Sequence, residues 1–186
     1  MKEFLLLFGS LLFISCSTKI TCPQISNENT SKIALLDHGK HSSLIIEDSD
    51  KMVRYAYGDW EYYALGKPSF WNGVKALFWS TQAGLGKKIL QGPVSETNIK
   101  TELKVLVDGI YIFDVETTKT KTLLKNLDKL HQTHKHNIHY NQKYDLNFVR
   151  LPESYWLFNN SNQKTAWWIE SLGCRAKGLA LVSIWQ

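Results

Sequence analysis

The sequence predicts an α+β domain, an antiparallel sheet packed with helices, because strand-like and helix-like segments are mixed along the chain. Short apolar or alternating runs at 33–37, 42–47 and 53–57 are typical of strands. Apolar side chains recur at helical spacing over 69–83 and again over 117–134. The short turns between the strand candidates indicate hairpins and therefore antiparallel pairing.

The second half of the chain continues this mixture. Strand candidates at 103–107 and 110–115 bracket Asp108-Gly109, which is a strong hairpin signal. Three later segments complete the expected fold: a strand at 145–151, a helix at 165–172 and a last strand at 179–185.

Length and composition narrow the class of protein. The chain has 186 residues, of which 44% are hydrophobic and 21% are charged. These values exclude a disordered tail, a collagen-like fibre and a polytopic membrane protein, and the length suits one domain. The net charge of +5 permits contact with anionic lipid, cell-wall polymer or nucleic acid without indicating any of them. We expect no nucleic-acid partner and no cofactor.

The N-terminus is typical of a secreted protein. An apolar run from Phe4 to Ile14 is too short to span a bilayer and fits the core of a secretion signal. It ends in Ser15-Cys16, which resembles the lipobox of bacterial lipoproteins. That resemblance implies cleavage before Cys16, a lipid on its thiol and, because Ser17 is not acidic, the outer membrane. The alternative is an uncleaved membrane anchor, and both place the rest of the chain outside the cytoplasmic membrane.

These signals divide the chain into a lipoprotein signal peptide at 1–15, a polar tether at 16–31 and one domain at 32–186. Acylation of Cys16 would leave two other cysteines, Cys22 and Cys174. An oxidising envelope permits a bridge between them, but the sequence alone does not show whether they approach within bonding range.

Two histidine groups are candidates for chemistry. His131, His134, His136 and His139 lie in one stretch and could bind a metal, or they could simply form the solvated end of a helix. His38 and His41 lie between two strand candidates, where a histidine can act as a general base or as a structural hydrogen-bonding group. The spacing alone favours the structural interpretation in both cases.

A third candidate is the polar run 159–162, NNSN, ahead of a predicted helix. A nucleophile there would lie at the positive end of the helix dipole, near free backbone N–H groups, as an acyl-transfer site requires. Asn and Ser are also the preferred N-cap residues, so the sequence alone favours a simple cap.

Three segments together resemble motifs of one family. The first is HGKHSSL at 38–44, which resembles H-G-W-H-T-G-hydrophobic; the second is YGDWEYY at 57–63, which resembles G-W-G-D-x-x-F-Y. The third is YWLFNNSN at 155–162, which resembles Y-H-L-x-x-T-C-N. These motifs occur in this order in a bacterial lipoprotein family catalogued as a domain of unknown function. That family is similar to the permuted NlpC-type branch of papain-like cysteine hydrolases, in which His precedes Cys.

The resemblance implies roles for particular residues. His41 would be the base and Ser161 would occupy the position of the nucleophile. Asp59, or alternatively His38, would orient the imidazole of His41. The principal departure is Ser161, because the family has Cys there and a serine hydroxyl loses its proton far less readily than a thiol.

We therefore expect an envelope lipoprotein, held at the membrane by lipid on Cys16, whose degenerate papain-like site binds an unidentified envelope ligand or protein. One alternative is an active amide or ester hydrolase or acyltransferase that uses Ser161 and His41. Another is a metal-binding lipoprotein that uses the histidines at 131–139. The first two interpretations predict that Ser161 and His41 point into one cleft, roughly 3 to 4 Å apart.

Overall fold

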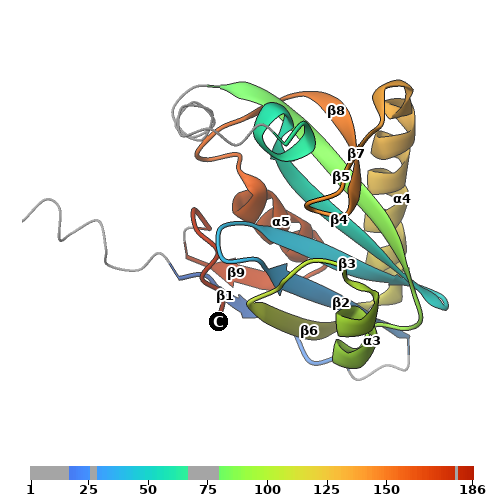
Figure 1. Cartoon of the computed structure of the whole chain (residues 1–186). Coiled ribbons are helices and arrows are strands. Elements are labelled where there is room, and N and C mark those ends of the chain that lie inside the picture. Colours follow the sequence, from blue (N-terminus) through green and yellow to red (C-terminus); the bar gives the residue numbers. More distant parts are fainter. Residues whose placement is uncertain (1–16, 26–28, 67–79, 179) are drawn as a thin grey trace, which may run out of the picture.

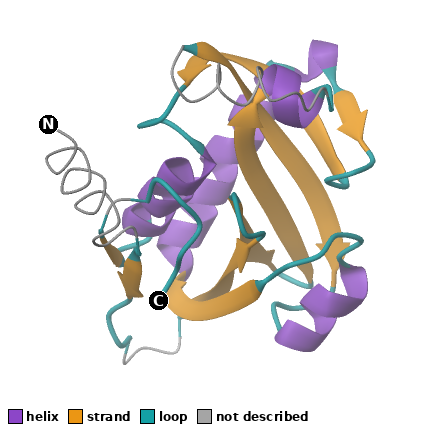
Figure 2. Cartoon of the chain, turned by 60° about the vertical axis from the view of Figure 1, so that its left-hand side comes forward, coloured by secondary structure: helices purple, strands orange, loops and turns teal. Residues whose placement is uncertain are grey.

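The structure is a computed structural model, and it describes residues 17–25, 29–66, 80–178 and 180–186. It confirms the α+β class: a curled seven-stranded antiparallel sheet carries helices on both faces (Figures 1 and 2). The strand order is β6-β2-β3-β4-β5-β8-β7. The strands are β2 (Thr30–Asp37), β3 (Ser42–Asp48), β4 (Lys51–Asp59), β5 (Thr81–Gln91), β6 (Gly109–Glu116), β7 (His139–Asn141) and β8 (Leu146–Tyr155).

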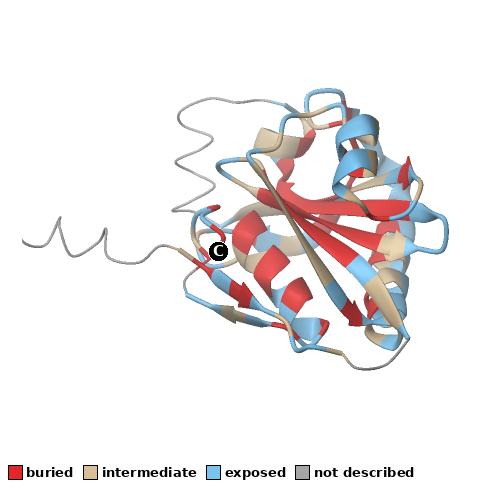
Figure 3. Ribbon diagram, turned by 90° about the horizontal axis from the view of Figure 1, so that it is seen from below, coloured by how far each residue is buried: buried red, intermediate tan, exposed pale blue. Residues whose placement is uncertain are grey.

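Alternation along β4 shows how the two faces are built. Val53, Tyr55 and Tyr57 belong to the main core, which includes Leu123 of α4 (Thr117–Thr133) and Ile169 of α5 (Ser161–Ser171). The residues between them point to the other face, because successive strand side chains alternate. On that face Ala56 packs with the π-helical turn η1 (Trp60–Ala64), and Met52, earlier on β4, belongs to a cluster with Ile99 of α3 (Glu96–Glu102). Figure 3 shows the buried residues along the central strands and on one side of α5.

The expected strands at 33–37, 42–47 and 53–57 are confirmed within β2, β3 and β4, and 145–151 lies in β8. The expected helix at 117–134 is confirmed as α4, which is followed by a short turn of 3-10 helix, η2 (Lys135–Asn137).

The helix expected at 69–83 is wrong at its end, because residues 81–83 begin β5; residues 69–79 lie outside the described residues. The strand TQAGLGKKILQ was not predicted, since its glycines and lysines break the apolar alternation. Gly86 has a packing role there: a Cβ would lie 2.9 Å from Cε1 of Phe148. The glycine therefore lets the Phe148 ring lie against β5.

Three other predictions need correction. Residues 103–107 form no strand, and β6 pairs with the distant β2 instead of forming a local hairpin. The last strand expected at 179–185 reduces, in its described residues, to one bridge between Trp185 and Thr18. The last helix begins at Ser161 rather than at 165, because Asn160 accepts a hydrogen bond from Gln163 N–H and caps it.

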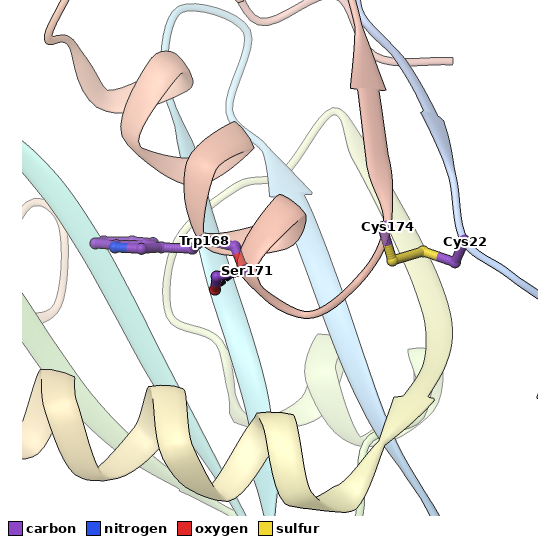
Figure 4. Close-up of a disulfide and its surroundings, with 4 residues drawn as sticks. All are labelled: Cys22, Trp168, Ser171 and Cys174. Atoms are coloured by element: carbon purple, nitrogen blue, oxygen red, sulfur yellow. Dashed lines mark hydrogen bonds between the residues drawn. A yellow bond between two sulfur atoms is a disulfide. The ribbon is translucent and has the colours of Figure 1, made fainter.

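The expected tether at 16–31 is partly folded. Residues Lys19–Thr21 form β1, which pairs antiparallel with β9 (Arg175–Lys177). Directly beyond this pair, Cys22 and Cys174 form a disulfide (Figure 4). The bridge that the sequence left open thus fastens the N-terminal segment to the end of α5, across 152 residues of chain.

Replacement of both Cys22 and Cys174 by Ala should lower the free energy of unfolding by about 2–5 kcal/mol, because the bridge closes a long loop in the unfolded chain. Urea denaturation of the oxidised full chain measures this change. A reducing agent should weaken the unaltered protein and leave the double variant unaffected. Equal urea midpoints for the two oxidised proteins would contradict a formed bridge.

Candidate functional site

A pocket of about 270 Å³ opens at the start of α5. Ser161 is the first residue of this helix, and the cap by Asn160 fixes how the chain enters it. The wall combines phenol rings, amide side chains and two aliphatic residues. It is lined by Gly39, Lys40, Tyr62, Tyr63, Tyr155, Asn160, Ser161, Asn162, Leu181 and Val182.

Ser161 is only 2% exposed and lies beside Tyr155, which ends β8. Burial raises the pKa of Tyr155 to about 12, and the backbone and side chain of Ser161 act in the opposite direction. Because donors lower the pKa of a phenol, the N–H and the hydroxyl of Ser161 face the phenolic oxygen of Tyr155. The phenol of Tyr155 therefore lies at the start of the helix.

His41 lies among aromatic rings at the start of β3. Its imidazole stacks on His38 with 4.9 Å between ring centroids, and meets the edges of Tyr63 and Tyr144 at 5.1 and 5.4 Å. Burial, followed by the charges of His38, Arg54 and Lys143, lowers the pKa of His41 to about 3. The imidazole is therefore neutral at pH 7.

The expected direct contact between base and nucleophile is not made. The hydrogen bonds of the described residues include none between His41 and Ser161, and Tyr63 contacts the rings of both His41 and Tyr155. Gly58 leaves space for Tyr63 there, since a Cβ would lie 2.8 Å from its Cδ2. The two chain segments nevertheless meet, because Asn162 Nδ2 donates to the carbonyl oxygen of Lys40 at 3.3 Å.

His38 belongs to a buried network centred on Arg54, whose side chain is 1% exposed. Arg54 donates from Nε to Ser43 Oγ at 3.0 Å, from Nη1 to the Tyr144 carbonyl at 3.1 Å and from Nη2 to His38 Nε2 at 3.2 Å. Since His38 Nε2 accepts, its Nδ1 carries the proton and donates to the Leu106 carbonyl at 3.0 Å. Burial and the adjacent Arg54 lower the pKa of His38 to about 4.

Asp59, the first choice for orienting His41, has a different contact. Its Oδ1 accepts a hydrogen bond from Tyr62 N–H at 2.7 Å and caps η1. Its Oδ2 is buried without a hydrogen-bond partner, and no hydrogen bond joins it to His41 within the described ranges. Asp59 thus positions the turn that carries Tyr62 and Tyr63, whereas His38 touches His41 only by stacking.

The histidines at 131–139 do not converge. His131 is buried and its Nε2 lies 3.0 Å from the Asn147 carbonyl, while His134 Nδ1 lies 2.9 Å from the Leu130 carbonyl of its own helix. His136 and His139 are exposed. No three His, Cys, Asp or Glu side chains form a metal-binding group in the part of the chain that the structure describes. The arrangement supports the helix-end interpretation.

Sequence reasoning gave no role to Tyr63, Tyr155 or Arg54. Tyr155 begins the third motif segment only six positions before Ser161, so a tight turn between strand and helix was a usable signal. Arg54 lies between Val53 and Tyr55 in a segment predicted as a strand, and a charged residue within such a segment is a signal of a buried polar network when the strand is central.

Two aromatic side chains stand exposed beside this site. Trp156 and Phe158 pack edge to face, with 5.2 Å between centroids, on the turn that leads into α5. They are 43% and 50% exposed, so a substantial aromatic surface lies next to the residues that cap the helix. Exposed aromatic pairs of this kind often mark a ligand or partner contact.

In comparisons with family models, curated proteins and solved structures, nothing matches this chain. No helix among the described residues is long and apolar enough to cross a bilayer.

The low pKa values of His38 and His41 predict pH-dependent stability. The unfolded histidines accept protons below pH 6.5, whereas the folded ones do so only near pH 4 and 3. Stability from these residues is therefore complete above pH 6.5 and is lost as the pH falls towards 3, by up to about 1.4 kcal/mol per pH unit for each histidine.

His41→Phe should consequently make the fall in unfolding free energy between pH 6 and 4 shallower by about 1 kcal/mol per pH unit. The phenyl ring can stack without accepting a proton. Denaturant titrations at several pH values measure the slope, and His136→Gln at an exposed position is the control. An unchanged slope for His41→Phe would show that His41 titrates freely.

Arg54→Ala should lower the free energy of unfolding by about 2–4 kcal/mol, because Ser43, His38 and the Tyr144 carbonyl lose buried hydrogen-bond donors. Arg150→Ala removes the same side chain from an exposed position of β8 and should change stability by less than about 0.5 kcal/mol. Thermal and urea unfolding compare the two variants, and equal losses would refute a stabilising Arg54 network.

Proposed function

We propose that this chain is a lipid-anchored protein of the bacterial cell envelope, in the outer membrane. Its permuted papain-like domain no longer catalyses and binds a ligand in the pocket at the start of α5. The chain order supports the permutation, since His41 on the sheet precedes the helix that begins with Ser161. The signal-like run and Ser15-Cys16 support the anchor.

The observation that carries the loss of catalysis is the position of the Tyr155 phenol, which faces Ser161 at the start of α5. Acyl transfer requires N–H donors that are free to stabilise the oxyanion of the intermediate. Here the N–H at the helix start and the hydroxyl that would attack both face one phenolic oxygen. A substrate carbonyl would have to displace Tyr155, which is buried in the main core.

His41, the residue expected to act as the base, is also poorly suited to catalysis. A serine hydroxyl must lose its proton during attack, and a general base works best when its pKa lies near the working pH. The pKa of His41 near 3 makes its imidazole a weak base at pH 7. The ring of Tyr63 also contacts the rings of both His41 and Tyr155. These features favour binding over the alternative of an active hydrolase.

The remaining wall of the pocket supports a small amphipathic ligand. Tyr62 and Tyr63 offer ring surface, Leu181 and Val182 offer aliphatic surface, and Lys40 adds a cation. Pockets that combine apolar surface with a few polar groups are the usual form of small-molecule sites. The exposed Trp156 and Phe158 extend the aromatic surface beyond the pocket.

A fluorophosphonate probe should leave Ser161 of the full chain unlabelled at pH 7, because neither a base nor a free oxyanion site activates the hydroxyl. Peptide mass spectrometry reads the labelled residue. Labelling of Ser161 that disappears in His41→Ala would contradict the proposal and establish the hydrolase.

A cysteine at the same position measures the environment directly. Ser161→Cys should react with iodoacetamide at pH 7 at least about tenfold more slowly than Ser171→Cys at the exposed end of the same helix, because burial disfavours the thiolate. Faster reaction of Ser161→Cys than of Ser171→Cys would show that an activating site survives.

A further inference from the structure

The N- and C-terminal segments of the domain form one ribbon. On one edge of β1 lies β9, in the register Lys19↔Lys177 and Thr21↔Arg175. On the other edge, Thr18 N–H donates to the Ile184 carbonyl at 2.8 Å and Gln186 N–H donates to the Thr18 carbonyl at 3.0 Å. Figures 1 and 2 show β1, β9 and the C-terminus together on one side of the molecule.

Alternation gives this ribbon an inner and an outer face. Ile20 and Trp185 are buried in the main core, with 7% and 4% of their surface exposed. Ala176 pairs with Ile20. The residues that flank Ile20, Ala176 and Trp185 in the chain are exposed and point outward: Lys19, Thr21, Arg175, Lys177, Ile184 and Gln186. We call this outer surface the basic ribbon face.

The basic ribbon face carries positive charge that the described residues do not neutralise. Lys19 lies opposite Lys177, an arrangement that destabilises a strand pair because like charges face each other. The residues of the ribbon, 17–22, 174–178 and 184–186, include no Asp or Glu. None of the ion pairs found between described residues involves Lys19, Arg175 or Lys177. The face is therefore complementary to an anionic surface.

The position of this face in the chain identifies the anionic surface. Lys19 is three residues from Cys16, so even an extended connection is only about 10 Å long. A lipid on Cys16 would thus hold the cations within about one Debye length of the membrane surface, where attraction to anionic headgroups is effective. Ile184, which is 49% exposed, offers an apolar side chain on the same face.

We propose that the basic ribbon face binds anionic phospholipid headgroups and orients the domain on the membrane. This inference rests on the proposed lipid anchor at Cys16. The chain is held from Thr18 onward by backbone hydrogen bonds and, at Cys22, by the bridge to Cys174. Only Ser17 therefore lies between Cys16 and the first paired residue of the ribbon. The C-terminal segment that contributes Ile184 also contributes Val182 to the pocket, so contact with the membrane sets the direction in which the pocket opens.

The test is lysine protection in the full chain attached to vesicles. The protein is incorporated from detergent into vesicles of phosphatidylcholine, or of phosphatidylcholine and phosphatidylglycerol in equal parts. It is then treated with a membrane-impermeant acetylating reagent. Labelling of Lys19 and Lys177 should fall at least about fivefold in the anionic vesicles and recover in high salt. Lys125, an exposed residue near the middle of α4, should be labelled equally in both.

Equal labelling of Lys19 and Lys177 in the two kinds of vesicle would overturn the proposal, and so would protection that persists in high salt. The mass of the N-terminal peptide reports acylation of Cys16 separately. If Cys16 is unmodified, the proposed anchor fails, and co-sedimentation with anionic vesicles still tests the face. Arg175→Gln with Lys177→Gln should then reduce sedimentation, whereas Lys121→Gln with Lys125→Gln on α4 should not; equal loss in both double variants refutes a specific face.

Discussion

The position of the Tyr155 phenol against Ser161 is the constraint on which the proposed function depends. The phenol brings the end of β8 to the start of α5, where it faces the N–H and the hydroxyl that acyl transfer would need. The Asn160 cap holds the helix start in this position, and burial of Tyr155 in the main core makes its displacement costly. A helix start that faces a buried phenol can form the wall of a binding pocket, which supports the proposed binding role.

The sheet itself explains why the imidazole and the hydroxyl stay apart. Helix α5 packs on the face that carries Val53 and Tyr55, whereas Arg54 points to the opposite face. His38 is bound to Arg54 there, and His41 stacks on His38. The two segments meet where Asn162 donates to the Lys40 carbonyl, and Tyr63 contacts the rings of both His41 and Tyr155. Burial near Arg54 also keeps both imidazoles neutral, so the arrangement stabilises the fold at the expense of basicity.

Apolar patterns within short stretches of sequence predicted the strands and the helix whose own residues carry such a pattern. The strands around Leu35, Leu44 and Tyr55 and the helix around Leu127 have a clear period, and all are confirmed. Strand β5 was missed because its stability comes from neighbours on both sides, and its glycines admit the rings of other elements. At the site, the cap at Asn160 could be predicted, whereas the position of Tyr63 depends on a turn that packs across the sheet. Pairing of β6 with β2 is likewise a long-range event that no short window of sequence contains.

The central claim is that His41 is a buried, neutral ring that does not serve Ser161. An NMR titration of the His41 ring nitrogens in the full chain tests this most directly. The account predicts that the ring stays neutral down to about pH 4, in keeping with its pKa near 3, and that Ser161→Ala leaves the titration unchanged. A midpoint above pH 6 that moves when Ser161 is replaced would contradict the account, because it would place the imidazole and the hydroxyl in one reactive pair.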